Sequence, residues 1–505
     1  MKKILLNLVL CVVASVAFAQ QPAFISDSLD AYIEREMKRW NIPAVAIAIV
    51  KDGQVIVEKG YGVIDLESGK KTDEHSLFMI ASNSKAFTGT ALANLDYQKR
   101  LSLDDKVTKH LPYFSLAETH SSQLATVEDL MCHRLGFETF QGDFLNWSSN
   151  LTRRQVVEGM ARNIPYYNFR DTYGYCNSGF VAAGEVLYAV TDTTWDAYLQ
   201  VHFFDPLDMQ RTSTTQAAIK ADKNACTPYT MFDGQLVKLQ YDYIDNLGPA
   251  ASINSSVHDI SHWLLMQLDN GKYKGKQIFP EQVVKMPRVP RTVVGSGNPG
   301  LYKSQHFSLY GLGWFITDYE GRRIYSHGGG ANGFVTNTTF VPEAGLGIVV
   351  LTNTDANSLY DALRYQIMEA YFGVPYRNLS AIYYERASKG NAEADAQLAA
   401  WRKTVAEKPK PALPLEAYAG TYTNTVYGDI MIEVSGNALK VSFSHHPQLT
   451  GKLMPAGANN FICFYDPVTW GVKEVPFTVE NGVVTGCSIM VNDFIDFLSY
   501  DFVRK

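Results

Sequence analysis

A serine and a lysine lie three residues apart at Ser82-Asn-Ser-Lys85, where an apolar strand end runs into a predicted helix. Residues three apart on a helix are neighbours, so the hydroxyl and the amine are expected to share one face. A buried amine must be paired or lose its proton, and a lysine with a lowered pKa can act as a base. A solvated lysine on a surface helix is the other interpretation of this segment taken alone.

Two distant segments carry further side chains that could take part in chemistry. Tyr175-Cys-Asn177 places a phenol and a carboxamide two residues apart in a loop flanked by glycines, and His327-Gly-Gly-Gly330 opens a strand. Glycines in such a strand allow a ligand to approach the backbone closely. Each segment alone could be an ordinary loop or a packed tyrosine ring, but their combination with Ser82 and Lys85 is improbable by chance.

In this order the three segments resemble the nucleophile motif, the second motif and the third motif of the serine β-lactamase and penicillin-recognising family, in particular its class C-like and esterase branch. Asp129–Gly136, the helix expected from Val257 and Tyr310–Trp314 also match family landmarks, so the resemblance covers residues 28 to 372. It implies an α+β sandwich in which helices flank a five-stranded antiparallel sheet beside an all-helical lobe.

The resemblance implies that Ser82 attacks an ester, lactam or amide carbonyl and that water hydrolyses the resulting acyl-enzyme. Lys85 and Tyr175 are both candidate bases, best treated as a coupled pair, and Lys85 is expected to lower the pKa of Tyr175. Backbone N–H groups of Ser82 and Gly330 are the expected oxyanion hole. The other expected substrate-binding or orienting residues are Asn177, His327, Gly328 and Gly329.

One departure from the family pattern bears on the substrate. Penicillin-binding relatives usually have Lys-Thr-Gly where this chain has His327-Gly-Gly, and a histidine is mostly neutral at pH 7. The carboxylate-binding lysine is therefore absent, which favours an esterase or a D-amino-acid-type peptidase or amidase over a strong β-lactamase. A catalytically idle receptor with this fold is the alternative function. A Ser-His-Asp triad is disfavoured, because no Gly-x-Ser-x-Gly segment is present.

Composition and charge limit the partners. A net charge of -6 argues against nucleic acid and anionic membranes, and the expected partner is a small-molecule or peptide substrate. Five scattered cysteines follow residue 19, with no spacing typical of a disulfide framework or a zinc site. We expect no metal and no cofactor.

The chain is expected to begin with a signal peptide at residues 1–19, because two lysines precede an apolar run and Ala-Phe-Ala, so a periplasmic or secreted bacterial protein is predicted. No later segment is apolar enough to span a membrane. The predicted divisions are a hydrolase domain at 20–380, a helical and proline-rich linker at 381–413, and a small all-β barrel domain at 414–505.

Several local elements are also predicted. They are a helix at 28–40, a hairpin through Asp52-Gly53, helix caps at Thr126 and Ser256, and strands at 310–316 and 495–502.

Overall fold

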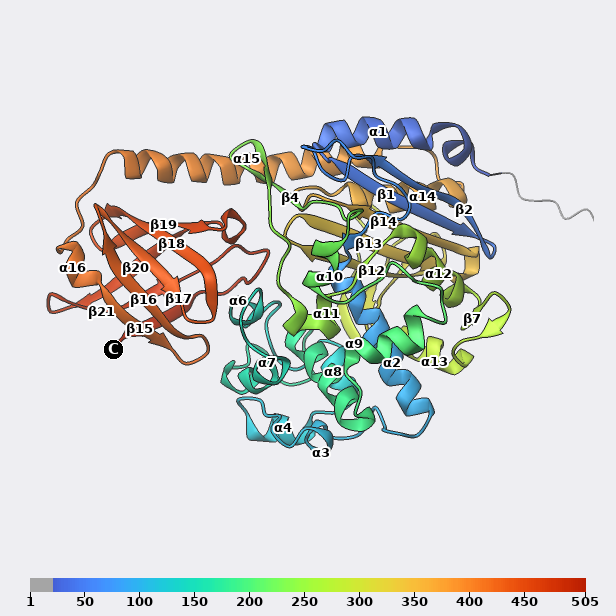
Figure 1. The fold of residues 1–505 in the computed structure, drawn as a ribbon, viewed down its shortest axis with the longest axis horizontal. Coiled ribbons are helices and arrows are strands. Elements are labelled where there is room, and N and C mark those ends of the chain that lie inside the picture. The colour runs from blue at the N-terminus through green and yellow to red at the C-terminus, as the bar shows by residue number, and fades with distance from the viewer. Residues whose placement is uncertain (1–20) are drawn as a thin grey trace, which may run out of the picture.

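The computed structural model describes residues 21–505, so the predicted signal peptide at 1–19 lies outside the described residues. An α+β unit carries the three motifs, and a β-barrel follows it (Figure 1). Within the described part of the chain, no helix is both long enough and apolar enough to cross a membrane.

The centre of the first unit is an eight-stranded antiparallel sheet with the order β2-β1-β14-β13-β12-β11-β10-β9. Its strands are β1 (Ala44–Lys51), β2 (Gln54–Gly62), β9 (Thr292–Gly295), β10 (Ser308–Tyr310), β11 (Phe315–Tyr319), β12 (Arg322–Ala331), β13 (Phe334–Val341) and β14 (Leu346–Thr352). The expectation of five strands was therefore too low. The predicted strand at 310–316 is interrupted after Tyr310, because Gly313 has a φ of 90° and the chain turns there into β11.

Both faces of the sheet are covered, as the sequence of β1 shows. Val45, Ile47 and Ile49 of this strand belong to a core with α1 (Leu29–Trp40) and α14 (Leu359–Phe372). The alternating alanines of β1 face a second core that includes α2 (Ser84–Tyr97) and α12 (Val257–Leu268). A strand buried on both faces is apolar throughout, which explains its uninterrupted run of apolar residues.

Helix α8 (Asn177–Thr191) packs against α2 and against three helices of the helical lobe, α5 (Val127–Met131), α7 (Arg153–Gly159) and α11 (Gly248–Ala251). The predicted caps are confirmed, since Thr126 accepts from the backbone N–H of Asp129 and Ser256 accepts from that of Asp259. Several further helices are short: α3 (Val107–His110), α4 (Thr119–Leu124), α6 (Asp143–Asn146), α9 (Trp195–Leu199), α10 (Gln216–Ala221), α13 (Glu281–Lys285) and α16 (Leu415–Tyr418). Short strands also form pairs: β3 (Phe78–Met79) with β6 (Asn254–Ser255), β4 (Tyr229–Phe232) with β5 (Gln235–Lys238), and β7 (Lys272–Tyr273) with β8 (Lys276–Gln277).

A single long helix, α15 (Leu379–Ala406), runs from the sheet to the barrel, as Figure 1 shows. Its 28 residues correspond to about 42 Å. The second unit is a closed barrel of eight strands in sequence order, which confirms the predicted all-β barrel. These strands are β15 (Gly420–Asn424), β16 (Gly428–Ser435), β17 (Ala438–Phe443), β18 (His446–Gly457), β19 (Asn460–Asp466), β20 (Val472–Glu480), β21 (Val483–Ile489) and β22 (Tyr500–Arg504).

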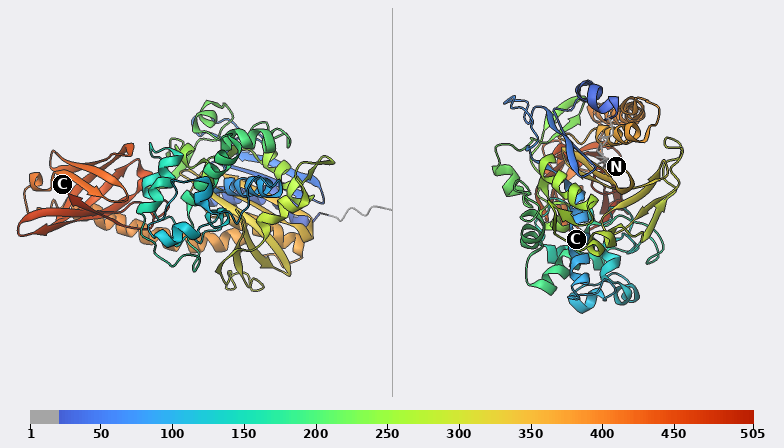
Figure 2. Two further views of the ribbon diagram at one scale, coloured as in Figure 1. Left: turned by 90° about the horizontal axis from the view of Figure 1, so that it is seen from below. Right: turned by 90° about the vertical axis from the view of Figure 1, so that its right-hand side faces the viewer.

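The last predicted strand of the barrel was misplaced. Residues 490–499 form a loop, and β22 begins only at Tyr500. The apolar residues at 495 and 498 suggested a strand facing the barrel core. Part of this loop instead packs against the first unit, since Asp496 accepts from the backbone N–H of Phe144. The left view of Figure 2 shows the two units side by side.

Phe144 of α6 makes an apolar contact between the two units. Phe144 is 1% exposed, and its ring lies 4.6 Å from the stacked ring of Tyr427 and 5.6 Å from that of Tyr500. His446 of the barrel also contacts the carbonyl oxygen of Trp147, at 2.8 Å. An aromatic side chain from the helical lobe therefore occupies the aromatic core at one end of the barrel.

Phe144→Ala is expected to destabilise the protein by about 3–5 kcal/mol, because it leaves a cavity among barrel aromatics. Urea unfolding followed by tryptophan fluorescence would measure the change. Phe497→Ala is the matched control, since that ring is 45% exposed and its loss should cost no more than about 1 kcal/mol. Equal effects of the two substitutions would contradict the packing described for Phe144.

Candidate active site

Ser82 lies in a single turn of 3-10 helix, Ala81–Asn83, directly before α2, rather than in the first turn of α2 itself. Ala81 has a φ of 47°, a left-handed conformation that is unusual for a residue other than glycine. The Asn83 side chain holds the turn by donating to the Ile80 carbonyl at 2.7 Å and to Thr336 Oγ1 at 2.9 Å. The turn leaves Ser82 partly exposed while its neighbours are buried.

The Lys85 amine is fully buried and has three oxygen neighbours. Its Nζ lies 3.1 Å from Ser82 Oγ, 2.6 Å from Asn177 Oδ1 and 3.0 Å from the Ala250 carbonyl oxygen. Burial lowers the pKa of Lys85 to about 7, although the nearby Asp143 acts in the opposite direction. The amide and carbonyl oxygens can only accept hydrogen bonds, so they engage two N–H groups. The third position faces Ser82, and in the neutral amine it is a lone pair that can take the serine proton.

Tyr175 lies beside this pair, with Lys85 Nζ 4.6 Å from the centre of its ring. The ring stacks on His133 at 4.2 Å, and His133 Nδ1 accepts from the backbone N–H of Cys176 at 3.0 Å. Burial raises the pKa of Tyr175 above its ordinary value, and a hydrogen bond with Ser82 opposes this shift only in part. The pKa of Tyr175 is therefore raised and not lowered as expected, because desolvation outweighs the hydrogen bond with Ser82.

Asn177 is fixed at both ends of its carboxamide. Oδ1 accepts from Lys85, and Nδ2 donates to Asp143 Oδ2 at 2.6 Å. Burial raises the pKa of Asp143 to about 8, with the Asn177 hydrogen bond acting against it. Asn177 thus contacts Lys85 on one side and Asp143 on the other, and the sequence analysis missed Asp143. No fixed spacing to a motif distinguishes Asp143 in the sequence.

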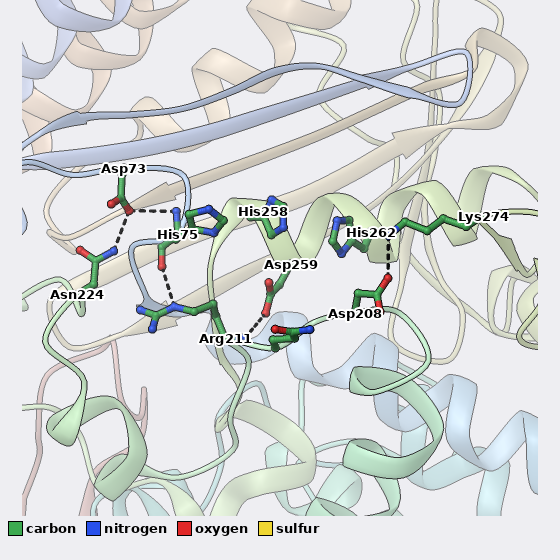
Figure 3. Close-up of a pocket in the computed structure, with 10 residues that line it drawn as sticks. Asp73, His75, Asp208, Arg211, Asn224, His258, Asp259, His262 and Lys274 are labelled. Carbon is green, nitrogen blue, oxygen red and sulfur yellow. Dashed lines mark hydrogen bonds and ion pairs between the residues drawn. The ribbon is translucent and has the colours of Figure 1, made fainter.

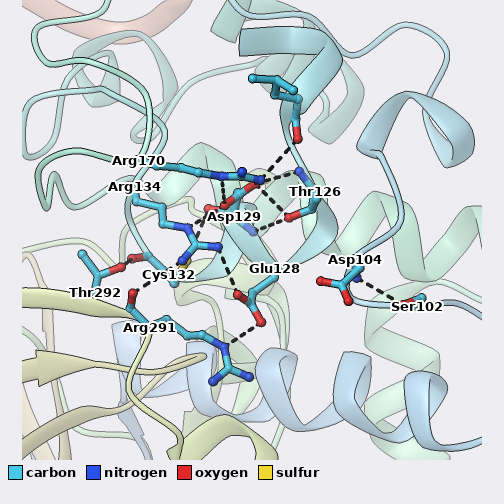
Figure 4. Close-up of polar contacts among 11 residues, drawn as sticks. Ser102, Asp104, Thr126, Glu128, Asp129, Cys132, Arg134, Arg170, Arg291 and Thr292 are labelled. Carbon is cyan, nitrogen blue, oxygen red and sulfur yellow. Dashed lines mark hydrogen bonds and ion pairs between the residues drawn. The ribbon is translucent and has the colours of Figure 1, made fainter.

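The loop before Tyr175 is held by ion pairs, as Figure 4 shows. Arg170 Nη2 lies 2.6 Å from Asp129 Oδ2, and Arg134 Nε lies 2.5 Å from Asp129 Oδ1. Although burial acts against it, the pKa of Asp129 is lowered by Arg170, the Thr126 backbone and Arg134. Arg170 therefore ties the loop to α5.

The residues of the third motif lie on β12, beyond the point where β11 pairs with it. β11 pairs with β12 only as far as Ser326, whereas β13 pairs with β12 as far as Ala331. Gly329 packs against the Ile80 carbonyl so tightly that a Cβ there would lie 2.0 Å from its oxygen. Gly328 and Gly330 line a cavity with Ser82, whereas Gly329 does not, so Gly329 holds the strand against the nucleophile turn.

His327 is 2% exposed and both of its ring nitrogens have partners. Nδ1 lies 2.6 Å from the Gly328 carbonyl oxygen and must donate to it, so Nε2 accepts from the Tyr310 hydroxyl at 2.9 Å. Burial lowers the pKa of His327 to about 3, with the Lys85 charge adding to the effect. His327 is therefore neutral and does not replace the missing lysine as a cation.

These side chains border a cavity of about 340 Å³. Among the described residues that line it, none is lysine or arginine. The lining residues are Ser82, Thr139, Phe140, Asp143, Trp147, Tyr173, Tyr175, Asn177, Phe315, His327, Gly328, Gly330, Phe494 and Ile495. The last two come from the barrel, which the sequence analysis did not connect with the site.

The rate of acylation of Ser82 is expected to rise about tenfold per pH unit below pH 7 and to level off above it, because only neutral Lys85 can take the serine proton. Stopped-flow measurements with an activated ester between pH 5.5 and 9 would give the profile. A rate that is flat or falls between pH 6 and 8 would contradict this assignment.

A second, wider groove of about 830 Å³ lies elsewhere on the first unit (Figure 3). Three histidines line it, and the ring of His258 lies 4.5 Å from that of His75 and 4.6 Å from that of His262. None of its lining residues has a hydroxyl or a thiol. In residues 21–505 no three His, Cys, Asp or Glu side chains are arranged to hold a metal ion. The cavity at Ser82 is therefore the candidate active site.

Comparison with known proteins agrees with the fold and the motifs. The sequence profile of the family described as Beta-lactamase matches residues 29–372, and the chain belongs to this family. Its fold is that of the β-lactamases and penicillin-binding proteins, as the resemblance implied. A domain of unknown function, DUF3471, matches residues 405–503.

Two relatives are similar in sequence. The chain is 27% identical to Protein flp of Staphylococcus aureus over 332 residues, which cover 65% of this chain and 63% of that protein. It is 26% identical over 435 residues to Unguisins hydrolase ungD of Aspergillus violaceofuscus, covering 80% of this chain and 76% of the fungal protein.

Two solved structures share the fold. The octameric penicillin-binding protein homologue from Pyrococcus abyssi has a TM-score of 0.61 at 18% identity, and the match covers 94% of this chain and 99% of that chain. The structure described as SurE has a TM-score of 0.57 at 16% identity, covering 95% and 98% of the two chains. At these identities the similarity concerns the fold alone.

Proposed function

We propose that this protein hydrolyses an ester or amide through an acyl-enzyme on Ser82. The observation that carries the proposal is the contact of 3.1 Å between Ser82 Oγ and a buried amine whose pKa is lowered to about 7. A serine hydroxyl needs a base within hydrogen-bond reach to become an effective nucleophile. Membership of a family of serine hydrolases supports the same chemistry.

In the proposed mechanism, Ser82 Oγ bonds to the carbonyl carbon of the substrate and its proton passes to neutral Lys85. Backbone N–H groups of Ser82 and Gly330 are assigned to the oxyanion. Tyr175 keeps its proton at neutral pH, so it suits donation to the departing alcohol or amine, and Lys85 can return the proton to Tyr175. Water then cleaves the acyl-enzyme, releasing the acid and restoring the Ser82 hydroxyl.

An esterase or a D-amino-acid-type amidase is favoured over a strong β-lactamase. His327 stands in place of the carboxylate-binding lysine, is neutral, and has both nitrogens engaged within the protein. Together with the absence of lysine and arginine from the described cavity lining, this leaves little to attract a substrate carboxylate. Turnover of p-nitrophenyl esters and D-amino-acid amides should therefore exceed that of a cephalosporin. Rapid cephalosporin hydrolysis would contradict this preference.

A fluorophosphonate probe tests the reaction itself. It should label the protein once, and peptide mass mapping should place the label on Ser82. Ser84, two residues away, donates to the Ala81 carbonyl at 2.7 Å, so Ser84→Ala should leave labelling in place. Absence of a label, or a label elsewhere, would favour the idle receptor.

We further propose the division of the chain into residues 20–380, 381–413 and 414–505, and a periplasmic or secreted location. The location rests on the signal-peptide pattern of residues 1–19.

A further inference from the structure

The C-terminal barrel supplies part of the candidate active-site wall. Phe494 and Ile495 lie in the loop between β21 and β22, and both line the cavity that contains Ser82. These residues follow Ser82 by more than 400 positions, and nothing in the three motifs points to them.

Phe494 contacts the strand at the position assigned to the oxyanion hole. A Cβ built on Gly330 would lie 2.9 Å from Cζ of the Phe494 ring, closer than real Cβ atoms approach. The ring therefore lies directly against Gly330 and occupies the space into which a side chain there would extend. Because β11 leaves His327–Ala331 uncovered on one side, the Phe494 ring limits a space that a bound acyl group could otherwise use.

The loop that carries Phe494 is anchored on the first unit. Asp496 Oδ2 accepts from the backbone N–H groups of Gly142 and Phe144, each at 3.1 Å, and from the Tyr500 hydroxyl at 2.7 Å. Asn492 Oδ1 accepts from the backbone N–H of Phe494 at 3.1 Å. A buried carboxylate with three donors holds the loop in one place.

The aromatic residues Phe140, Trp147 and Phe315 also line the cavity, and no lysine or arginine is among its described lining residues. The volume of about 340 Å³ is at the lower end of the range for small-molecule sites. Shape and polarity together suit a compact apolar group.

We propose that Phe494 of the barrel is a specificity-determining residue that restricts the acyl group of the substrate to compact apolar groups. The proposal rests on the acyl-transfer function proposed above and adds the substrate class. It also gives the barrel a role in the site, because the docked loop completes the cavity wall.

The test compares p-nitrophenyl acetate, butyrate and octanoate, which share a leaving group and differ only in the acyl chain. The full-length protein should prefer the short esters. Phe494→Ala should raise the ratio of kcat/KM for octanoate to that for acetate by about tenfold or more, since steric exclusion of extra methylenes is relieved. Phe494→Leu should fall between the two, and Phe494→Trp should lower the ratio. A ratio unchanged in Phe494→Ala would overturn the proposal.

Phe497→Ala is the matched control, because Phe497 lies in the same loop but does not line the cavity. The octanoate-to-acetate ratio of kcat/KM in this variant should equal that of the unmodified protein. Urea unfolding identifies any variant that fails to fold. The rates at which ethyl and octyl fluorophosphonates label Ser82 provide the same comparison without an ester substrate. Labelling at Ser82 with an unchanged size preference in Phe494→Ala overturns only this inference, whereas absence of labelling overturns the proposed function.

Discussion

Replacing Ser82 with alanine is expected to reduce kcat for ester hydrolysis by on the order of 10⁶-fold, the scale seen when a catalytic serine is removed. The substitution deletes only Oγ, which lies 3.1 Å from Lys85 Nζ and at the edge of the cavity. Steady-state hydrolysis of p-nitrophenyl acetate would measure the loss. Because Ser82 is partly exposed, the free energy of unfolding should change little.

Two controls make this result specific. Ser84→Ala should hydrolyse the ester within about tenfold of the unmodified rate. The hydroxyl of Ser84 does not face the cavity, because it donates to the Ala81 carbonyl and accepts from the Ile253 N–H. Ser82→Cys should become reactive toward thiol reagents at this position. If Ser82→Ala hydrolysed the ester at the rate of the unmodified protein, the acyl-enzyme on Ser82 would be excluded.

Lys85→Met is expected to slow acylation by about 10²–10⁴-fold, the usual contribution of a general base. Methionine has a similar length and no proton-accepting amine, so the packing around Ser82 is largely kept. Single-turnover kinetics with an activated ester would separate acylation from deacylation. The inflection near pH 7 that Lys85 produces should disappear as well.

The pH profile distinguishes a base from a merely structural lysine. A variant that had lost only packing would be slower at every pH and would keep the inflection. Lys85→Met also leaves Asn177 Oδ1 and the Ala250 carbonyl without their donor, so unfolding in urea should be measured alongside the kinetics. Full activity in Lys85→Met would assign the proton transfer to Tyr175 instead.

Features set by neighbouring residues were predictable from the sequence. The hairpin through Asp52-Gly53 and the cap at Ser256 follow from backbone preferences and from side chains a few positions apart. Ser82 and Lys85 are close for the same reason, since three positions along a helical turn bring them together. The motif spacing therefore gave both the family and the local geometry of the pair.

Features set by packing were not predictable in this way. The sequence suggested a strand at 495–502, because apolar residues there fit a barrel core as well as they fit a loop. The direction of the Tyr175 pKa was also wrong, since desolvation depends on how completely His133 and other neighbours enclose the ring. Neither burial nor loop placement can be deduced from residue spacing alone.

The sequence by itself determined the nucleophile segment, its lysine and the two partner motifs, together with the family, because these depend on residue type and short-range spacing. Only the tertiary structure brought Asp143 to Asn177 and Phe494 to Gly330. These contacts join segments that are 34 and 164 positions apart, the first within the helical lobe and the second between the barrel loop and β12. The reactive serine is thus encoded locally, whereas the shape of the space around it depends on the docked barrel.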